Sequence, residues 1–193
     1  MHGFVRNAAR LLCCCLLTAA TLAHTQAAPA KPAVGTVMSP AATYGKLLSG
    51  MEKEFVDAVE AMPEDKFNFA PPEAAGEFKG VRTFAGQVKH VAGSNYYFFG
   101  GPKMTQADVK AKEDSIEKLT SKADVVKALK DSFALAHTFV DGITAENAFV
   151  FTETGTRGGM AAFGLAHMMD HYGQLVVYLR MNGIVPPASR GGM

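Results

Sequence analysis

The stretch FGLAHMMDHYGQLVVYLRMNG, residues 163–183, has the residue pattern of one long helix near the C-terminus. His167, His171, Gln174 and Tyr178 recur at i, i+4, i+7 and i+11, so they lie on one face of this predicted helix. The positions around them are apolar: Phe163, Leu165, Met168, Met169, Leu175, Val176, Val177 and Leu179. Because a helix that is apolar on nearly all sides is normally buried, the pattern predicts a core helix with a stripe of polar groups that need partners.

Three further amphipathic patterns precede this helix, and no stretch has a convincing strand pattern. They cover residues 39–62, 83–99 and 121–143, and the C-terminal helix itself is predicted from Gly159 to Asn182. A short helical piece is predicted after Thr105, because Thr105 and Asp108 have the spacing of a capping box. Four long helices in one domain's length of chain predict an all-α fold, a four-helix bundle. The long links 63–82 and 101–120 argue against a simple up-down-up-down order.

The N-terminus has the features of an export signal. Arg6 and Arg10 precede a 13-residue apolar run, Leu11–Ala23, and Thr25-Gln26-Ala27 offers small residues where a signal peptidase cuts. The apolar run is shorter than the roughly 20 residues that span a bilayer. We therefore expect a signal peptide at 1–27, a Pro/Ala-rich linker at 28–38, and an exported domain at 39–193 without a membrane segment; an uncleaved signal anchor is the alternative.

Composition excludes several classes of chemistry. All three cysteines, Cys13, Cys14 and Cys15, lie in the predicted signal, so the mature chain has no disulfide, no cysteine ligand and no cysteine nucleophile. Without Arg6 and Arg10 the chain keeps 17 Lys and Arg against 18 Asp and Glu, a net charge of −1. Nothing in this balance indicates a nucleic-acid partner, which needs a clustered basic surface.

Two histidines four residues apart on one helix face can bind one metal ion. His90 and His137 are the candidates for a third ligand, since His2 and His24 lie in the predicted signal. His90 is preferred because its helical neighbours Gly86, Gly93 and Ser94 are small, leaving room for a metal and a substrate or letting another helix approach closely. His137 lies at the edge of an apolar stripe, where a histidine is usually structural.

From spacing alone, His167 and His171 are either metal ligands or core histidines with buried acceptors. The pair is not part of a HExxH protease motif, because Met168 follows His167 and no glutamate stands in the general-base position. Gln174, one turn beyond His171, is the predicted outer partner that orients a ligand. Asp170 and Tyr178 are weaker candidates for the same role.

Three segments resemble the DinB-like superfamily of four-helix metalloproteins: RTFAGQVKHVAGSNYYFFG at 82–100, AHMMDHYGQLVVYLRMNG at 166–183, and IVPPASR at 184–190. The resemblance covers about residues 40–190. It implies an up-down-down-up bundle and a divalent metal, commonly zinc or nickel, bound by His90, His167 and His171. It also implies that two copies can pair through bundle helices.

The resemblance further implies a metal-dependent enzyme, either an S-transferase that activates a low-molecular-weight thiol or a hydrolase. An export signal departs from the family's usual pattern, and cytosolic thiols are scarcer outside the cytoplasm. The alternative is a non-catalytic exported module that binds a metal or a small ligand, and a third reading is a purely structural metal with a fourth protein ligand.

Overall fold

The computed structural model describes residues 31–191. The chain divides into two units, Met1–Thr36 and Val37–Met193. In the first unit, residues 31–36 have no helix or strand. The predicted signal peptide at 1–27 lies outside the described residues, as do the first residues of the predicted linker.

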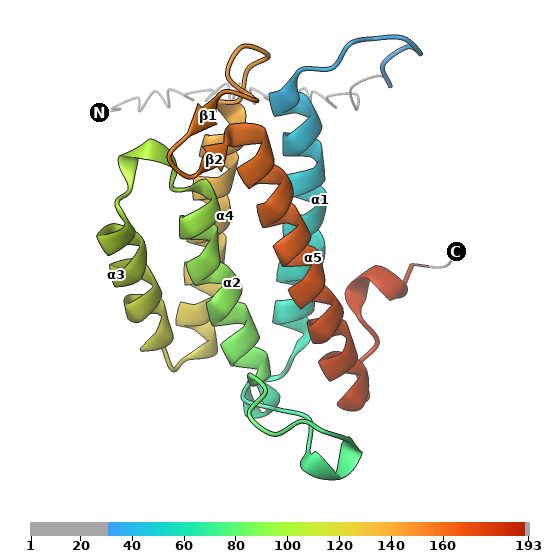
Figure 1. The fold of residues 1–193 in the computed structure, drawn as a ribbon. Coiled ribbons are helices and arrows are strands. Elements are labelled where there is room, and N and C mark those ends of the chain that lie inside the picture. Colours follow the sequence, from blue (N-terminus) through green and yellow to red (C-terminus); the bar gives the residue numbers. More distant parts are fainter. Residues whose placement is uncertain (1–30, 192–193) are drawn as a thin grey trace, which may run out of the picture. The chain divides into compact units, whose positions relative to one another are not determined.

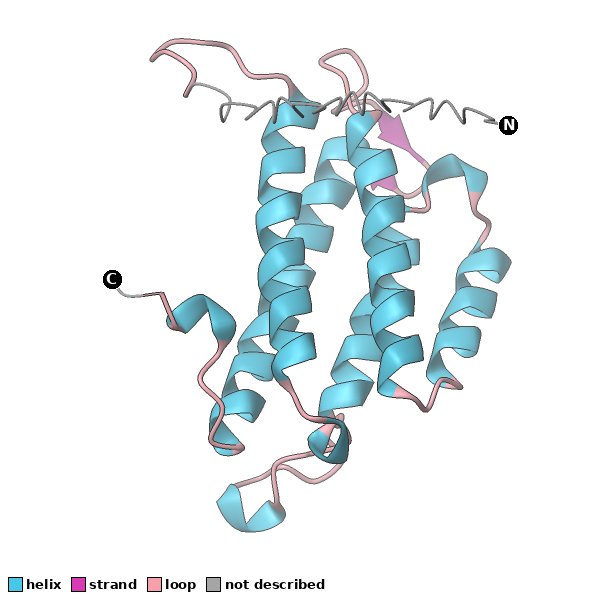
Figure 2. Ribbon diagram, turned by 180° about the vertical axis from the view of Figure 1, so that it is seen from behind, coloured by secondary structure: helices cyan, strands magenta, loops and turns pink. Residues whose placement is uncertain are grey.

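Within residues 31–191 the fold is mostly helical, which confirms the all-α prediction (Figure 2). The long helices are α1 (Pro40–Ala61), α2 (Phe84–Phe99), α4 (Lys122–Asp141) and α5 (Arg157–Met181), and α3 (Gln106–Glu117) is shorter. A hairpin of β1 (Phe151–Thr152) and β2 (Gly155–Thr156) precedes α5. Short 3₁₀ turns are η1 (Glu64–Lys66), η2 (Glu73–Ala75), η3 (Gly101–Lys103) and η4 (Pro187–Ser189).

Each of the five α-helices begins at a serine or threonine whose side-chain oxygen accepts a hydrogen bond from a backbone N–H of the first turn. The capping residues are Ser39, Thr83, Thr105, Ser121 and Thr156. Such caps satisfy donors that the helix leaves free, and each contributes about 1 kcal/mol. The predicted starts at Ser39, Thr83 and Ser121 are confirmed, whereas α5 begins two residues before the predicted Gly159 because Thr156 caps it.

The helix α3 is longer than the short piece that the sequence predicts. Thr105 and Asp108 form a complete capping box, so the predicted start is right. Only Val109 and Ile116 are buried along its 12 residues. Because so few positions face the protein, the helix has little apolar periodicity from which its length can be predicted.

The four long helices pack around one core (Figure 1). In Figure 1, α1 and α5 run downward while α2 and α4 run upward, and α3 lies outside against α2. Helix α2 contacts both α4 and α5, and α1 contacts the same two helices. The link through η3 and α3 returns the chain to the lower end, which lets α4 run parallel to α2.

Aromatic rings fill the core between these helices. Phe55 of α1 meets Phe133 of α4 edge-on with ring centroids 6.4 Å apart, and both rings are fully buried. Aromatic residues also anchor the link before α2: Phe67 packs on Phe84, and Phe69 packs on Tyr178 of α5. Burying a large apolar side chain stabilises the fold by roughly 2–3 kcal/mol, so these contacts hold the link against the helices.

Helices α5 and α2 approach each other closely at Gly164. A Cβ atom at this position would lie 2.5 Å from Cζ of Phe99 and 3.1 Å from Cβ of Phe98. Only a residue without a side chain fits there, and the two helices therefore approach closely one turn before His167. This contact sets the distance between the helices where they carry histidines.

The prediction that α5 is buried on nearly all sides is wrong for its outer face. Phe163, Met169 and Val177 are each more than half exposed. The opposite side of the helix, with Met168, Leu175 and Leu179, is fully buried. The helix is thus a layer between core and surface, and its outer face is apolar without being covered by the described residues.

The segment after α5 returns along the protein, and η4 packs against α1. The tail therefore folds back onto the helices. No helix in the described part of the chain is long and apolar enough to cross a membrane.

Candidate metal centre

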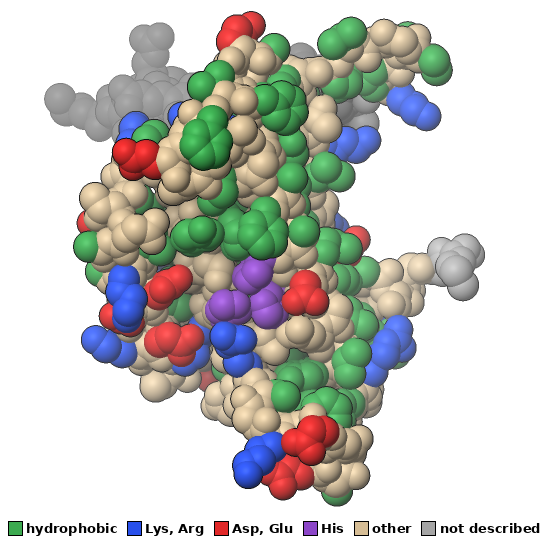
Figure 3. Space-filling model, viewed as in Figure 1, with side chains coloured by type: hydrophobic (Ala, Val, Ile, Leu, Met, Phe, Trp, Pro, Cys, Tyr) green, Lys and Arg blue, Asp and Glu red, His purple; other side chains and the backbone are tan. Residues whose placement is uncertain are grey.

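Helices α2 and α5 bring His90, His167 and His171 together. The Nε2 atom of His167 lies 3.2 Å from Nε2 of His90 and 3.2 Å from Nε2 of His171. One nitrogen from each ring lies within 4.8 Å of the others, and no fourth His, Cys, Asp or Glu joins the cluster within residues 31–191. In Figure 3 the histidines form one group on the surface between α2 and α5, with hydrophobic side chains above and charged ones beside and below.

The geometry of the cluster is compatible with metal binding. Zinc–nitrogen bonds of about 2.0–2.1 Å in a tetrahedral site place two ligand nitrogens about 3.3 Å apart. The separations at His167 are close to that value. Three imidazole nitrogens without a fourth protein ligand leave a coordination position open, as catalytic sites do.

Gln174 orients one ring of the cluster. Its Oε1 lies 3.0 Å from Nδ1 of His171. Because an amide oxygen only accepts hydrogen bonds, Nδ1 of His171 carries the proton, and the lone pair of Nε2 then points at the other histidines. Gln174 therefore contacts His171 on the side of the ring away from the other histidines. The buried Nδ1 atom of His167 has no partner among the described residues.

The small residues around His90 do not all have the predicted effect. A Cβ at Gly93 would lie 3.1 Å from Cγ of Glu113 on α3, so this glycine lets α3 approach α2. A Cβ at Gly86 would meet Thr83 and Arg82 at the start of the helix. Close approach of another helix is therefore observed at Gly93, whereas Gly86 meets only the residues that begin its own helix.

The remaining candidates lie outside the cluster. Nε2 of His137 is 2.7 Å from a carboxylate oxygen of Glu52, so this histidine links α4 to α1. The hydroxyl of Tyr178 donates to the backbone carbonyl of Arg82, 3.1 Å away. Asp170 is exposed on α5. The negative charge of Asp170 raises the pKa of His167 and so partly offsets the effects that lower it.

Burial keeps two of the clustered imidazoles neutral. It is the largest cause that lowers the pKa of His90 from 6.5 to about 4, and the positive charge of Arg82 adds to it. Burial likewise lowers the pKa of His167 to about 4, with the neighbouring His171 and His90 adding to the effect. A neutral imidazole is the form that binds a metal ion, so these two rings are ready to bind near pH 7.

These pKa values predict how the metal-free protein responds to acid. A folded-state pKa below the unfolded value means that the unfolded chain binds more protons, so the stabilisation is present above pH 6.5 and is lost as the pH falls toward 4. Leucine cannot titrate, so the His167→Leu variant should lose less stability than the wild type when the pH falls from 7 to 4. We expect this difference in the free energy of unfolding to be on the order of 1 kcal/mol, after discounting for the ring's partial exposure. Urea unfolding at pH 7, 5.5 and 4 measures it; identical pH profiles for both proteins would contradict the lowered pKa.

A second prediction concerns Gln174. Replacing it with leucine removes the acceptor that fixes the His171 ring, and loss of such a partner typically weakens metal binding 10–100-fold. Gln174→Glu keeps an acceptor at the same place and should retain most of the affinity. Competition with a chromophoric chelator measures both variants, and equal affinities for Q174L and wild type would show that the contact does not orient the ligand.

A pocket of about 720 Å³ opens beside the cluster. His171 and Gln174 line it together with Arg82, Gln87, and apolar residues of the link before α2 and of α5. Sequence patterns did not single out Arg82 or Gln87. The only signal was their position near the start of the helix that carries His90.

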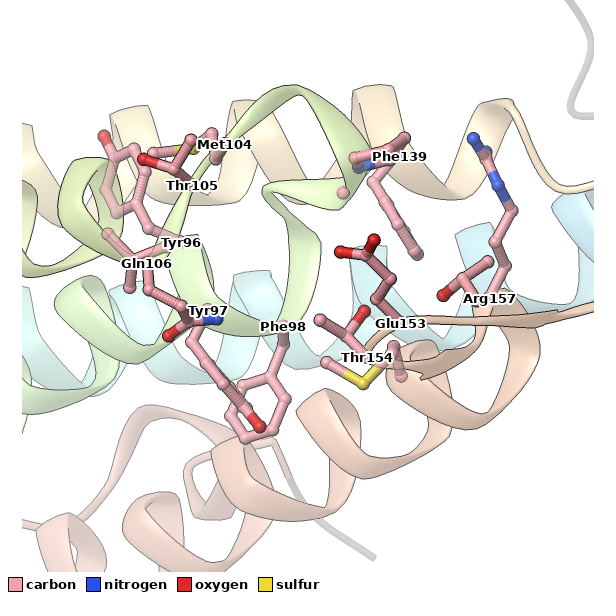
Figure 4. A pocket seen from close by; sticks show the side chains of 15 residues that line it. Tyr96, Tyr97, Phe98, Met104, Thr105, Gln106, Phe139, Glu153, Thr154 and Arg157 are labelled. Atoms are coloured by element: carbon pink, nitrogen blue, oxygen red, sulfur yellow. The ribbon is translucent and has the colours of Figure 1, made fainter.

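A separate cavity of about 650 Å³ lies between the end of α2, the start of α3 and the hairpin (Figure 4). Tyr97 and Phe98 lie on one side of it, while Glu153 and Thr154 of the hairpin lie across from them. The Phe98 ring also contacts His167, with centroids 5.1 Å apart. This aromatic cavity and the histidine cluster are therefore neighbours that share Phe98 as a wall.

The fold and the cluster define a helical protein with a three-histidine centre compatible with a divalent metal. The family model of the DinB superfamily matches residues 47–175, which include all three histidines. The chain belongs to the DinB superfamily. No curated protein matches it.

Proposed function

We propose that His90, His167 and His171 bind one divalent metal ion, zinc or nickel, and that the protein is a metal-dependent enzyme of the transferase or hydrolase type. The observation that carries this proposal is the meeting of three Nε2 atoms from two helices around one point. The donor set fits such ions, because neutral imidazole is their common ligand. The oriented ring of His171 agrees with a site built for a ligand.

When bound, such an ion supplies Lewis acidity to a water or thiol at its open position. The chain's own residues prepare that position. Burial keeps His90 and His167 unprotonated, and Gln174 holds the His171 ring with its lone pair toward the centre. The neighbouring pocket admits a substrate from the side of His171.

Metal content tests the proposal. We expect elemental mass spectrometry on the mature, tag-free protein to find about one zinc or nickel ion per chain. Reconstitution with each ion in turn, followed by chelation, then shows which ion is held. A protein that binds no ion after reconstitution would overturn the metal site and leave the histidines as core residues.

A non-catalytic binding module is the second candidate. The cavity beside Phe98 favours it, because about 650 Å³ lined by aromatic and methionine side chains, with polar groups such as Glu153 and Arg157 among them, suits a small molecule. The two functions differ in what they need: turnover of thiols or hydrolysable substrates requires the metal, whereas ligand binding in the cavity survives chelation. A screen of both kinds of compound with and without chelator separates them.

We also propose the larger organisation: a signal peptide at 1–27, a linker at 28–38, and an exported domain at 39–193 arranged as an up-down-down-up four-helix bundle. Helices α1 and α5 run antiparallel to α2 and α4, and this arrangement supports the proposed bundle. We propose in addition that two copies pair, and the exposed apolar residues on the outer face of α5 support this. N-terminal sequencing of the exported protein and its mass in solution test these points.

A further inference from the structure

The pocket beside His171 contains two polar groups that the metal site does not use. It is lined by His171, Gln174 and Tyr178 of α5, by Gln87 of α2, and by Phe78, Val81 and Arg82 of the link before α2. The pocket is open to solvent and adjoins the metal centre directly, because His171 and Gln174 belong to both. A molecule in this pocket would therefore lie next to His171, whereas His90 and His167 do not line the pocket.

Arg82 supplies a positive charge that no described side chain neutralises. Within residues 31–191 its guanidinium takes part in no ion pair and no side-chain hydrogen bond, in contrast to Lys89, which pairs with Glu117 nearby. The hydroxyl of Tyr178 donates a hydrogen bond to the backbone carbonyl of Arg82, and this contact fixes the backbone of Arg82 at the pocket. Its charge reaches the cluster, since it adds to the effect of burial on the pKa of His90.

Gln87 supplies an unpaired acceptor. Its side chain is 5% exposed and lines the same pocket, and its Oε1 atom has no hydrogen-bond partner among the described residues. An unsatisfied buried acceptor costs about 1–3 kcal/mol, and most buried polar groups avoid this cost. The Oε1 atom has less than 1 Å² of accessible surface, so a donor on a bound molecule would satisfy it once the Gln87 side chain turns this atom toward the pocket.

We propose that this pocket binds a small organic anion that carries a hydrogen-bond donor, with Arg82 pairing with the anion and Gln87 accepting from the donor. Phe78, Val81 and Val177 provide apolar walls for the body of the molecule, which favours an organic carboxylate over a bare inorganic anion. The assignment names the substrate class of the proposed metal enzyme and rests on that function. Arg82 and Gln87 act as specificity residues, placing the molecule beside the metal centre.

Calorimetric titration with lactate and propanoate tests the assignment on the zinc-loaded protein. Charge-assisted pairing contributes roughly 1.5–3 kcal/mol, so we expect Arg82→Gln to weaken the binding of both anions at least tenfold. Lys79→Gln is the matched control: it removes the same charge from an exposed residue of the same link that does not line the pocket, and should change each Kd less than twofold. Equal Kd values for R82Q and K79Q would overturn the role of Arg82.

Gln87→Leu tests the donor. Lactate differs from propanoate by one hydroxyl, so we expect Q87L to weaken lactate about fivefold to tenfold and propanoate less than twofold. A preference for lactate that persists unchanged in Q87L would overturn the role of Gln87.

Zinc content, measured in every sample before titration, separates the two proposals. No zinc in the wild type would refute the metal centre, and the same titrations on the metal-free protein would then still decide the roles of Arg82 and Gln87. One zinc per chain without an effect of R82Q would leave the metal centre standing and refute the anion pocket.

Discussion

Replacing His167 with alanine is expected to weaken zinc binding by more than 100-fold and to leave the purified protein without a stoichiometric ion. His167 is the middle member of the cluster, since its Nε2 atom is 3.2 Å from the Nε2 atoms of both His90 and His171. Removing it leaves one ligand on each of two helices and no third donor from the described residues. Loss of an outer partner alone typically costs 10–100-fold in affinity, so loss of a ligand costs more. Elemental mass spectrometry and chelator competition measure the effect.

His137→Ala is the matched control for this experiment. It deletes the same imidazole from a partly buried site, but His137 pairs with Glu52 between α4 and α1, away from the cluster. The H137A variant should therefore keep one ion per chain and lose only a little stability. Wild-type zinc affinity in H167A, or equal losses in both variants, would contradict a centre made by His90, His167 and His171.

Replacing Gly164 with alanine is expected to lower the free energy of unfolding by about 2 kcal/mol. The new methyl group would lie 2.5 Å from Cζ and 2.7 Å from Cε2 of Phe99, whose ring is fully buried and packs on Phe139. Because that ring is buried and packed on Phe139, either the ring or α5 must shift to make room for the methyl group. Alanine is a better helix former than glycine by about 1 kcal/mol, and overpacking of this severity outweighs that gain. Urea unfolding measures the difference.

Gly173→Ala, on the same helix, is the control. No atom lies within 4 Å of a Cβ built there, so the intrinsic helix preference should raise stability by roughly 0.5–1 kcal/mol. Since Gly164 sets the approach of α5 to α2 one turn before His167, G164A should also weaken zinc binding, while G173A should not. If both glycine variants proved equally stable, the close approach of the helices at Phe99 would be refuted.

The helix starts were predictable because their signals are local. Ser39, Thr83 and Ser121 cap backbone N–H groups only two or three residues away, so the capping residue and the helix it begins stand together in the sequence. The buried stripe of Phe84, Val88, Val91 and Asn95 on α2 is likewise a local signal, because these residues recur every three or four positions. Asn95 finds its partner only across the core, where its amide donates to Ser132 of α4 over 2.9 Å.

Other features depend on surfaces that the sequence does not describe. The length of α3 and the exposure of Phe163 and Val177 follow from which faces the neighbouring helices cover. Apolar periodicity reports that a face prefers burial, but a helix at the edge of the fold can leave apolar residues in water. The hairpin of β1 and β2 is too short for an alternating pattern to indicate it.

The spacing of His167, His171 and Gln174 is enough to place them on a single helix face, because helical periodicity puts residues three and four apart side by side. Capping and breaking residues likewise indicate where most of the helices begin and end. The packing of the helices, in contrast, brings His90 to this face, leaves His137 away from it, and places Arg82 and Gln87 beside it. These contacts join residues far apart in the chain, and their distances are set by how closely α2 and α5 approach at Gly164.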